Sequence, residues 1–438
     1  MLEREIPREK ALVLHPRFAN ERAGDADYDL EEAVGLTEAL DAECVDSRII
    51  TVRELRASNF FGKGQIEEIA ALIQASEATL TIVNAALSPI QQRNLERDWK
   101  CKVIDRTGLI LEIFGLRAAT KEGRLQVELA RLGYERSRLV RTWTHLERQR
   151  GGQGFLAGPG ETQIESDRRI LNDKITKLRR DLENVRRTRG LQRKKRERAP
   201  ERVVALVGYT NAGKSTLFNA LTTGGVMAKD MLFATLDTTH RVLPLPSGQS
   251  AILSDTVGFI SDLPTDLITA FRATLEEVKD ADVLLHVRDI SDPLTERRRD
   301  EVLEVLDQID AGPEHGQEII EVWNKADLVM GDERAALNER AAATLDFEDM
   351  MNAYLVSCLS GEGLTDLLHG VEAALSVDDQ TLTVTIDPAN FSARAWLHSH
   401  GNVLLEDMRK SGNVDMRVRL SESDAGKFRS NYPALIND

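Results

Sequence analysis

The sequence contains only three cysteines, Cys44, Cys101 and Cys358, and they lie far apart in the chain. An odd number of widely spaced cysteines provides neither a disulfide framework nor the paired spacing of a zinc site. We therefore expect reduced, structural thiols, which are typical of a cytoplasmic protein. The eight histidines do not cluster with cysteine or aspartate at zinc spacing either.

Long apolar stretches are also missing. No apolar run reaches the roughly 18 residues that a membrane-spanning helix needs, and residues 70–87 are interrupted by Gln74, Ser76 and Glu77. Because the first residues are charged and mixed in sign, we expect neither a signal peptide nor a membrane span. With 438 residues, of which 42% are hydrophobic, the chain is long enough for several domains.

The basic residues are unevenly distributed. The formal net charge is −15, yet residues 168–198 contain 14 lysines and arginines against four acidic residues. This segment has a net charge of +10 and therefore leaves −25 for the rest of the chain. An acidic protein with one basic segment is typical of contact with a polyanion through a single element.

Two amphipathic helices are expected around a glycine-rich segment. Apolar residues follow heptad spacing from Leu125 to Leu146 and again from Ile164 to Val185. Residues 151–160 contain too much glycine and proline to stay helical, so the helices should form an antiparallel hairpin. The basic residues of its second arm are either a solvated coiled-coil face or a contact to nucleic acid.

Before this hairpin, short apolar runs alternate with helical patterns, which indicates a small α/β domain with parallel pairing. The expected strands cover 11–14, 42–45, 79–83 and 102–104, and the expected helices cover 30–40 and 65–73. The run Gly62-Lys63-Gly64 could be a phosphate loop, but it lacks the Walker spacing, and we favour a plain turn.

A phosphate-binding loop follows the apolar run 203–207. The chain reads Gly208-Tyr209-Thr210-Asn211-Ala212-Gly213-Lys214-Ser215-Thr216, which fits GxxxxGK[ST] between a strand and a helix. Backbone N–H groups of such a loop wrap phosphates at a helix N-terminus. We expect Lys214 to bridge the β- and γ-phosphates and the Ser215 hydroxyl to bind Mg²⁺.

A DxxG motif, Asp255-Thr256-Val257-Gly258, ends the next strand pattern at 251–254. Asp255 can hold Mg²⁺ through water, and the N–H of Gly258 can meet the γ-phosphate. A loop between the two motifs must also sense the γ-phosphate, with a threonine giving its hydroxyl to Mg²⁺. The candidates in this loop are Thr235, Thr238 and Thr239.

The base is expected to be guanine. After the apolar run 319–323 the chain reads Asn324-Lys325-Ala326-Asp327, the NKxD pattern. Asp327 can accept hydrogen bonds from N1 and N2 of guanine, and Asn324 can brace the loop, whereas adenine would leave the carboxylate unpaired. Ser357-Cys358-Leu359, after the strand pattern 354–356, is where a further loop would give a backbone N–H to guanine O6. Four motifs in this order predict binding of GTP and GDP with Mg²⁺.

Several long strings make the chain similar to the HflX family of translational GTPases over nearly its whole length. The strings are Leu87-Ser88-Pro89-Ile90-Gln91-Gln92-Arg93-Asn94-Leu95-Glu96, Asp105-Arg106-Thr107-Gly108-Leu109-Ile110-Leu111, Gly158-Pro159-Gly160-Glu161-Thr162-Gln163 and Phe233-Ala234-Thr235-Leu236-Asp237. The resemblance implies that Thr235, within Phe233-Ala234-Thr235, is the switch I threonine. It also implies binding to the large ribosomal subunit, with splitting or rescue of 70S ribosomes under stress, and for some members an N-terminal ATPase or RNA-remodelling activity.

Two positions bear on how the family pattern applies to this chain. Many members have proline where this chain has Thr238, a loop difference that should not alter function. Phe259 follows Gly258, where Ras-like GTPases have a glutamine that orients the attacking water. The family shares this apolar residue, so we expect slow hydrolysis alone, with Lys214, Thr235 and Gly258 as catalytic groups, and faster hydrolysis on the ribosome.

The expected fold class is α/β, in four parts. These are a small N-terminal α/β domain at 1–122, a helical hairpin at 123–199, a doubly wound P-loop GTPase domain at 200–376 and a small α+β domain at 377–438. In the last part, strands at 382–386 and 414–420 should flank a helix over 391–410. We expect a monomeric cytoplasmic protein that contacts rRNA through the basic hairpin. The alternatives are an ATP-dependent RNA-remodelling protein acting through its N-terminal domain, and a regulatory module for a membrane or protease partner.

Overall fold

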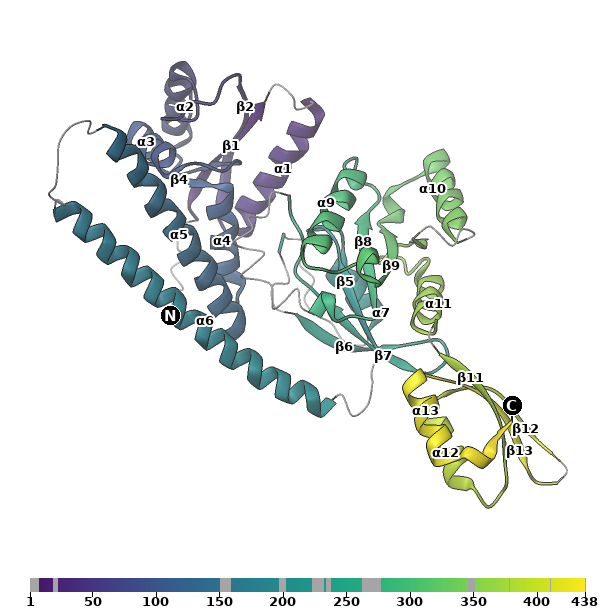
Figure 1. Ribbon diagram of the computed structural model, residues 1–438. Helices are drawn as coiled ribbons and strands as arrows, with labels where there is room; N and C mark the ends of the chain where they lie inside the picture. The colour runs from purple at the N-terminus through teal and green to yellow at the C-terminus, as the bar shows by residue number, and fades with distance from the viewer. Residues whose placement is uncertain are drawn as a thin grey trace, which may run out of the picture.

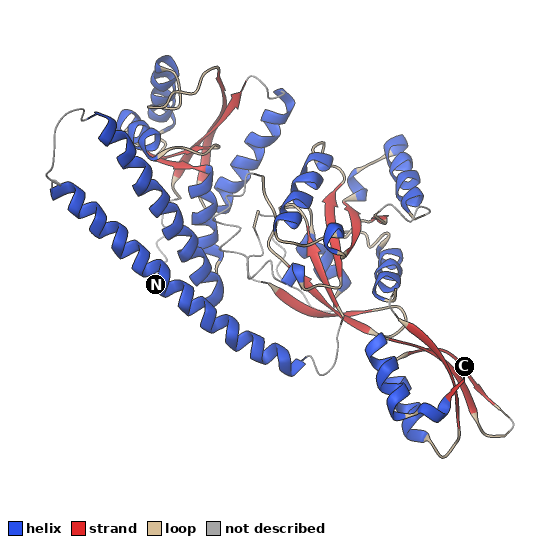
Figure 2. Ribbon diagram, viewed as in Figure 1, coloured by secondary structure: helices blue, strands red, loops and turns tan. Residues whose placement is uncertain are grey.

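Three β-sheets and a long helical hairpin make up the protein (Figure 1). The computed structural model describes residues 8–18, 23–149, 159–196, 202–222, 232–233, 238–261, 277–345, 351–377, 379–409 and 411–437. Helices cover both sides of the first two sheets, whereas the helices of the third, C-terminal sheet lie on one side of it (Figure 2). The expected α/β class with a small α+β unit at the C-terminus is confirmed.

The N-terminal sheet is entirely parallel, with the strand order β2-β1-β3-β4. Neighbouring residues of β1, such as Leu12 and Val13, are both fully buried because helices cover both faces of the sheet. The elements are β1 (Lys10–Phe18), α1 (Ala23–Ala39), β2 (Glu43–Val52), α2 (Lys63–Ser76), β3 (Leu80–Val83), α3 (Pro89–Trp99), β4 (Lys102–Asp105) and α4 (Arg106–Arg117). The run Gly62-Lys63-Gly64 begins α2, where the Gly62 N–H donates to Gln65 Oε1.

The hairpin consists of α5 (Lys121–Gln149) and α6 (Pro159–Arg196), which lie side by side in Figure 1. Leu132, Ile175 and Leu178 are buried between them, as their heptad positions predict. Residues 150–158, which include most of the glycine-rich segment, lie outside the described residues. The antiparallel hairpin expected from the sequence is therefore present.

The carboxylate of Asp105, which is 2% exposed, joins this hairpin to the N-terminal sheet. Oδ1 accepts from the Gly108 N–H at the start of α4 and from the Tyr134 hydroxyl of α5, both at 2.8 Å. Oδ2 accepts from the Leu87 N–H and from Arg138 Nη1, both at 3.2 Å. One buried side chain therefore fixes the end of β4, the start of α4 and the course of α5.

The central sheet has the strand order β10-β9-β8-β5-β7-β6, with only β6 antiparallel to its neighbour. Helices lie on both sides of it, so it is a doubly wound sheet whose carboxyl edge is the expected place for a ligand (Figure 2). The elements are β5 (Val203–Val207), α7 (Lys214–Leu221), β6 (Thr239–Pro244), β7 (Ser250–Asp255), β8 (Val283–Asp289), α9 (Thr295–Gln308), β9 (Glu318–Asn324), α10 (Gly331–Thr344), β10 (Ala353–Leu355) and α11 (Leu364–Leu375).

The C-terminal unit corrects one expectation. The helix expected over 391–410 ends at His400, and residues 402–408 form a strand. The backbone of Gly401 is extended, and a Cβ there would lie 2.5 Å from Val418 Cγ1, so the chain turns at this glycine into pairing with β13. The elements are β11 (Gln380–Ile386), α12 (Phe391–His400), β12 (Asn402–Met408), β13 (Val414–Leu420), α13 (Glu422–Asn431) and β14 (Ile436–Asn437).

Replacing Asp105 by alanine should loosen α4 and α5 together. The change removes a helix cap and leaves the buried N–H of Leu87 without its acceptor, so protection of α4 should fall by about 2–3 kcal/mol. Hydrogen exchange of the amides at 106–117 measures this. Asp27→Ala on the exposed surface of α1 is the control, with an expected change within about 0.5 kcal/mol. Wild-type protection of α4 in Asp105→Ala would contradict the assigned role.

Candidate nucleotide-binding site

The phosphate-binding loop lies between β5 and α7, at the carboxyl edge of the central sheet. Lys214 is the first residue of α7 and only 7% exposed. Its Nζ donates to the carbonyl oxygens of Gly208 at 3.0 Å and Tyr209 at 2.7 Å. Burial lowers the pKa of Lys214 to about 8, although the nearby Asp255 carboxylate acts to raise it. An anion beside this amine would favour the charged form.

Two glycines allow the motifs to approach each other closely. Gly213 has a φ of +96°, and a Cβ there would lie 2.2 Å from Asn324 Nδ2. A Cβ on Gly258 would lie 2.8 Å from Thr210 Cγ2 and 3.0 Å from Lys214 Nζ. The phosphate loop therefore contacts both the DxxG and the NKxD segments, and a side chain at either glycine would separate them.

Two oxygen ligands suited to Mg²⁺ lie together beside the phosphate loop. Ser215 Oγ donates to Asp255 Oδ2 at 2.8 Å. Asp255 is the last residue of β7 and 2% exposed, and the next residue, Thr256, donates its hydroxyl to the Leu206 carbonyl at 2.6 Å. A hydroxyl and a carboxylate are hard donors of the kind that Mg²⁺ prefers, so this pair fits the ion.

The NKxD segment is connected to both neighbouring loops. Asn324 Nδ2 donates to the Ala212 carbonyl at 2.9 Å, and Asn324 Oδ1 accepts from the Cys358 N–H at 3.3 Å. Ser357 Oγ donates to Asp327 Oδ1 at 2.6 Å, which fixes that carboxylate. Burial raises the pKa of the Cys358 thiol to about 12, so it remains a neutral group beside Asp327.

Lys325, the second residue of this segment, forms an ion pair with Asp289 at the end of β8, with 2.7 Å between Nζ and Oδ2. Asp289 is a site residue that the sequence analysis missed. A signal was present, because this aspartate ends the buried strand β8 just as Asp255 ends β7.

The remaining predicted residues are distributed around the loop. Asn211 is exposed in the left-handed region with a φ of +61°, and Thr216 is half-buried on α7. Val257 is buried at 6% exposure, whereas Leu359 is 82% exposed. Position 359 is therefore accessible to a ligand or to solvent.

The switch I candidates are only partly described. Ala234 and Thr235 lie outside the described residues. Thr239 is the first residue of β6 and pairs with Asp255. Phe233 is 3% exposed, and its ring packs edge-on against Phe114 of α4, with the centroids 4.7 Å apart. The segment just before Thr235 is therefore packed against the N-terminal unit.

A buried polar cluster joins the N-terminal unit to the phosphate loop, and we call its residues Glu32, Arg106, Tyr209 and Ser261 the junction. The Tyr209 hydroxyl donates to Glu32 and accepts from the Ser261 N–H at 2.9 Å. Arg106 Nη2 donates to Glu32 Oε1 at 2.5 Å and to the Ser261 carbonyl at 3.1 Å. Tyr209, Glu32 and Arg106 are between 5% and 7% exposed, so little water competes for these bonds.

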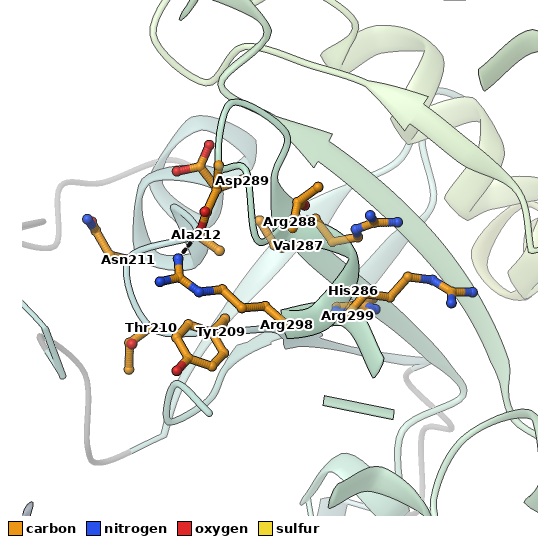
Figure 3. Close-up of a pocket in the computed structure, with 12 residues that line it drawn as sticks. Tyr209, Thr210, Asn211, Ala212, His286, Val287, Arg288, Asp289, Arg298 and Arg299 are labelled. Carbon is orange, nitrogen blue, oxygen red and sulfur yellow. Dashed lines mark hydrogen bonds and ion pairs between the residues drawn. The ribbon is translucent and has the colours of Figure 1, made fainter. Parts of the chain in front are cut away.

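Tyr209 belongs to the predicted phosphate loop, yet its side chain faces the junction. Burial and the Glu32 carboxylate raise the pKa of Tyr209, so its hydroxyl remains a donor. The Arg298 guanidinium lies 4.6 Å from the ring centroid, and Figure 3 shows it extending over the ring. The sequence offered no signal for Glu32, Arg106 or Ser261 as neighbours of this loop, because contacts between remote segments have no local pattern.

A small pocket lies behind the phosphate loop (Figure 3). Its lining residues are Tyr209, Thr210, Asn211, Ala212, His286, Val287, Arg288, Asp289, Asp292, Thr295, Arg298 and Arg299. Burial lowers the pKa of His286 to about 3, so the ring is neutral. Burial alone would raise the pKa of Glu321, but Arg288 and Arg299 bind this carboxylate and lower its pKa to about 2. The arginines of the wall are thus engaged by the protein itself.

Comparison with known proteins fits this geometry. Residues 203–325 match the family model of a 50S ribosome-binding GTPase, and residues 27–115 and 117–196 match the N-terminal and middle regions of a GTP-binding GTPase. Residues 339–431 match the HflX C-terminal domain. GTPase HflX of Escherichia coli is 40% identical over 437 residues, which cover 100% of this chain and 99% of that protein. The chain belongs to the HflX family of GTPases.

Another relative in sequence agrees with this assignment. GTPase HflX of Magnetococcus marinus is 51% identical over 346 residues, or 79% of this chain and 77% of its own. A solved GTP-binding protein of the archaeon Sulfolobus solfataricus in complex with GDP is 24% identical, with a TM-score of 0.46 over 84% of this chain and 98% of its own.

Among the residues that the structure describes, none of the helices combines the length and apolar composition needed to cross a membrane.

A double-mutant cycle measures the junction. Tyr209→Phe and Glu32→Gln should each lower the stability of the contact between the N-terminal unit and the phosphate loop by about 1–3 kcal/mol. Because the two side chains share one hydrogen bond, the double variant should lose about 0.5–3 kcal/mol less than the sum. Hydrogen exchange of α1 measures each loss. Strictly additive losses would show that the two groups do not interact.

Proposed function

We propose that the protein is a GTP-driven switch that binds the large ribosomal subunit. The observation that supports this best is the convergence of three motif segments at one edge of the central sheet. Asn324 binds the Ala212 carbonyl, and Ser215 binds Asp255, so the expected base, phosphate and metal positions are connected by hydrogen bonds. Membership in a family of GTPases supports GTP hydrolysis as the reaction.

At the phosphate end, the backbone N–H groups of residues 208–213 would surround the phosphates. Lys214 would bind the β- and γ-phosphates, and Ser215 and Asp255 would hold Mg²⁺. The metal would supply positive charge against the phosphate oxygens. The N–H of Gly258 would meet the γ-phosphate, and the family resemblance assigns Thr235 to the metal and the same phosphate. These roles explain why the oxygen atoms of Ser215 and Asp255, which suit Mg²⁺, lie beside the buried Lys214.

At the base end, the Asp327 carboxylate would accept hydrogen bonds from N1 and N2 of guanine. The Ser357 hydroxyl donates to this carboxylate and holds it in place. Asn324 braces the loop by bonding the Ala212 carbonyl and the Cys358 N–H. A backbone N–H of residues 357–359 would meet guanine O6. Adenine has an amino group where guanine has O6, so this amino group would face the backbone N–H donor without an acceptor. The site therefore strongly favours guanine.

Hydrolysis by the protein alone should be slow. The Phe259 side chain is 3% exposed, and its backbone bonds the phosphate loop through the Gly208 carbonyl and the Thr210 N–H. It therefore holds the DxxG segment against the loop, but it has no polar group to orient water. We expect turnover well below about 1 s⁻¹ without a partner and stimulation by the ribosome.

The basic second arm, residues 168–198, supports contact with rRNA, because its +10 charge stands against an acidic remainder. The junction gives such a contact a route to the nucleotide, since Asp105 holds α5 and the next residue, Arg106, binds Ser261. We further propose a monomeric cytoplasmic protein that splits or rescues 70S ribosomes under stress. We also propose that the chain consists of four domains, which end at residues 122, 199, 376 and 438.

The alternative of ATP-dependent RNA remodelling through the N-terminal unit is not favoured. A nucleotide on a parallel sheet binds at the carboxyl edge, between β1 and β3 for this strand order. In this protein Asn84 follows β3 at that edge and accepts from Arg106 Nη1 at 2.7 Å, and Arg106 in turn contacts Ser261 of the central unit. The position is thus covered by protein. None of the motifs identified in the sequence supports the membrane-partner alternative.

Binding of GDP should take up a proton. The pKa of Lys214 is about 8, so at pH 8.0 roughly half of the free protein has a neutral amine, and phosphate binding would charge it fully. Calorimetry in buffers of different ionisation enthalpy should give about 0.5 proton per GDP. His286, with a pKa of about 3, should not contribute. The Lys214→Arg variant should show no uptake, and equal uptake in both proteins would refute the role of this amine.

Co-sedimentation with purified 50S subunits and 70S ribosomes tests the function. We expect retention on 50S chiefly with a non-hydrolysable GTP analogue, and little with GDP, the matching ATP analogue or no nucleotide. Addition of 50S subunits should also raise the GTPase rate by at least tenfold. Equal pelleting in every nucleotide state, or none, would break the link between nucleotide and ribosome.

A further inference from the structure

The C-terminal unit has an uncovered sheet face. Its elements follow the order β-α-β-β-α-β, and the strand order β12-β13-β11-β14 makes it an antiparallel split β-α-β fold. Leu382, Val384, Met416 and Val418 are buried against α12 and α13, which both lie on one side. Figures 1 and 2 show no other described segment against the opposite side.

The register of the strands gives the residues on the open face. Thr381 pairs with Arg419, and Thr383 pairs with Arg417, in the β11–β13 ladder. Leu405 of β12 lies across from Arg417 on the other side. Because side chains alternate along a strand and the intervening residues are buried, these side chains point outward together. The face therefore presents two neighbouring pairs of one hydroxyl and one guanidinium.

The two arginines are available for a ligand. Within the described part of the chain, neither Arg417 nor Arg419 has an ion-pair or hydrogen-bond partner. The nearby carboxylate of Asp415 is engaged, because it accepts from Thr385 at 2.8 Å and from Arg409 at 2.5 Å. Two residues along a strand separate the Cα atoms by about 6.6 Å, so two guanidinium groups without an ion pair stand side by side, and the exposed carboxylate of Asp407 lies in the next row, across from Asp415.

The composition of the face selects the chemistry of its partner. Sheets of this kind that read RNA bases do so with aromatic side chains on the two central strands. Here those positions hold Thr381, Thr383, Arg417 and Arg419, which cannot stack a base as an aromatic ring does. Arginine and threonine are the usual donors to phosphate oxygens. We propose that this open face binds the phosphodiester backbone of RNA, independently of base sequence, as a contact separate from the helical hairpin.

RNA is favoured over an acidic protein segment by the arrangement of donors. Each guanidinium has a hydroxyl directly beside it, in two successive rows, so the face repeats the same donor pair along one direction. A repeated pair matches a repeating phosphate chain, whereas acidic side chains occur on peptides at variable spacing. The exposed Leu405, at 50%, adds an apolar contact for a ribose or base edge.

Binding of the full-length protein to labelled U20 and A20 RNA over a range of salt concentrations tests the proposal. Each phosphate contact on single-stranded RNA contributes about 0.7 to the slope of log K against log salt. The R417Q/R419Q variant should therefore lose about 1.4 from the slope and bind about five- to tenfold more weakly at 0.1 M salt, equally for both RNAs. The hairpin contribution is the same in both proteins. A wild-type slope and affinity would overturn the proposal.

Two control variants keep the test interpretable. R417K/R419K retains the charge and should keep most of the slope; if it loses as much as R417Q/R419Q, the positions act through the fold and the proposal fails. K427Q/R429Q removes two charges from α13, on the other side of the sheet, and should bind RNA as the wild type does. If it loses as much affinity as R417Q/R419Q, net charge alone sets the binding and the proposal fails. If R417Q/R419Q weakens binding to intact 50S subunits but not to RNA, the partner is a protein and the proposal is wrong.

Discussion

A buried contact of Glu32 with Arg106 and Tyr209 joins the N-terminal unit to the phosphate loop, and Ser261 bonds to both Arg106 and Tyr209. A buried ion pair stabilises a protein only when its hydrogen-bonding groups are satisfied, and here both Glu32 oxygens accept bonds. Loss of one partner would leave an uncompensated charge, at a typical cost of about 3–5 kcal/mol. The position of the phosphate loop and that of the N-terminal unit are therefore set together.

Two consecutive residues connect this contact to the hairpin. Asp105 binds the Tyr134 hydroxyl and Arg138 of α5, while Arg106 binds Glu32 and the Ser261 carbonyl. Because the two lie where β4 ends and α4 begins, any displacement of α5 acts on a segment that also contacts the DxxG loop. This continuity explains how a partner bound to the hairpin could alter a nucleotide site in another part of the chain.

Local patterns predicted much of the site but not its surroundings. The phosphate loop and Asp327 follow from motifs within a few residues, and the structure brings their segments together at one sheet edge. The junction had no such pattern, because Tyr209 and Glu32 are 177 residues apart. Residues 402–408 form a strand within the range 391–410 that was expected to be helical, and the isolated glycine Gly401 marks the boundary between helix and strand. The orientation of Tyr209 depends on long-range packing and could not be inferred.

Hydrogen exchange across the whole chain, with GDP and with a non-hydrolysable GTP analogue, tests most directly whether the junction couples the nucleotide site to the N-terminal unit. If the nucleotide site and the N-terminal unit act through the junction, the change of nucleotide should alter protection in α1 and α4 as well as around the phosphate loop. Arg106→Gln should confine the change to the central unit. Identical exchange of α1 and α4 in both nucleotide states of the wild-type protein would contradict the account.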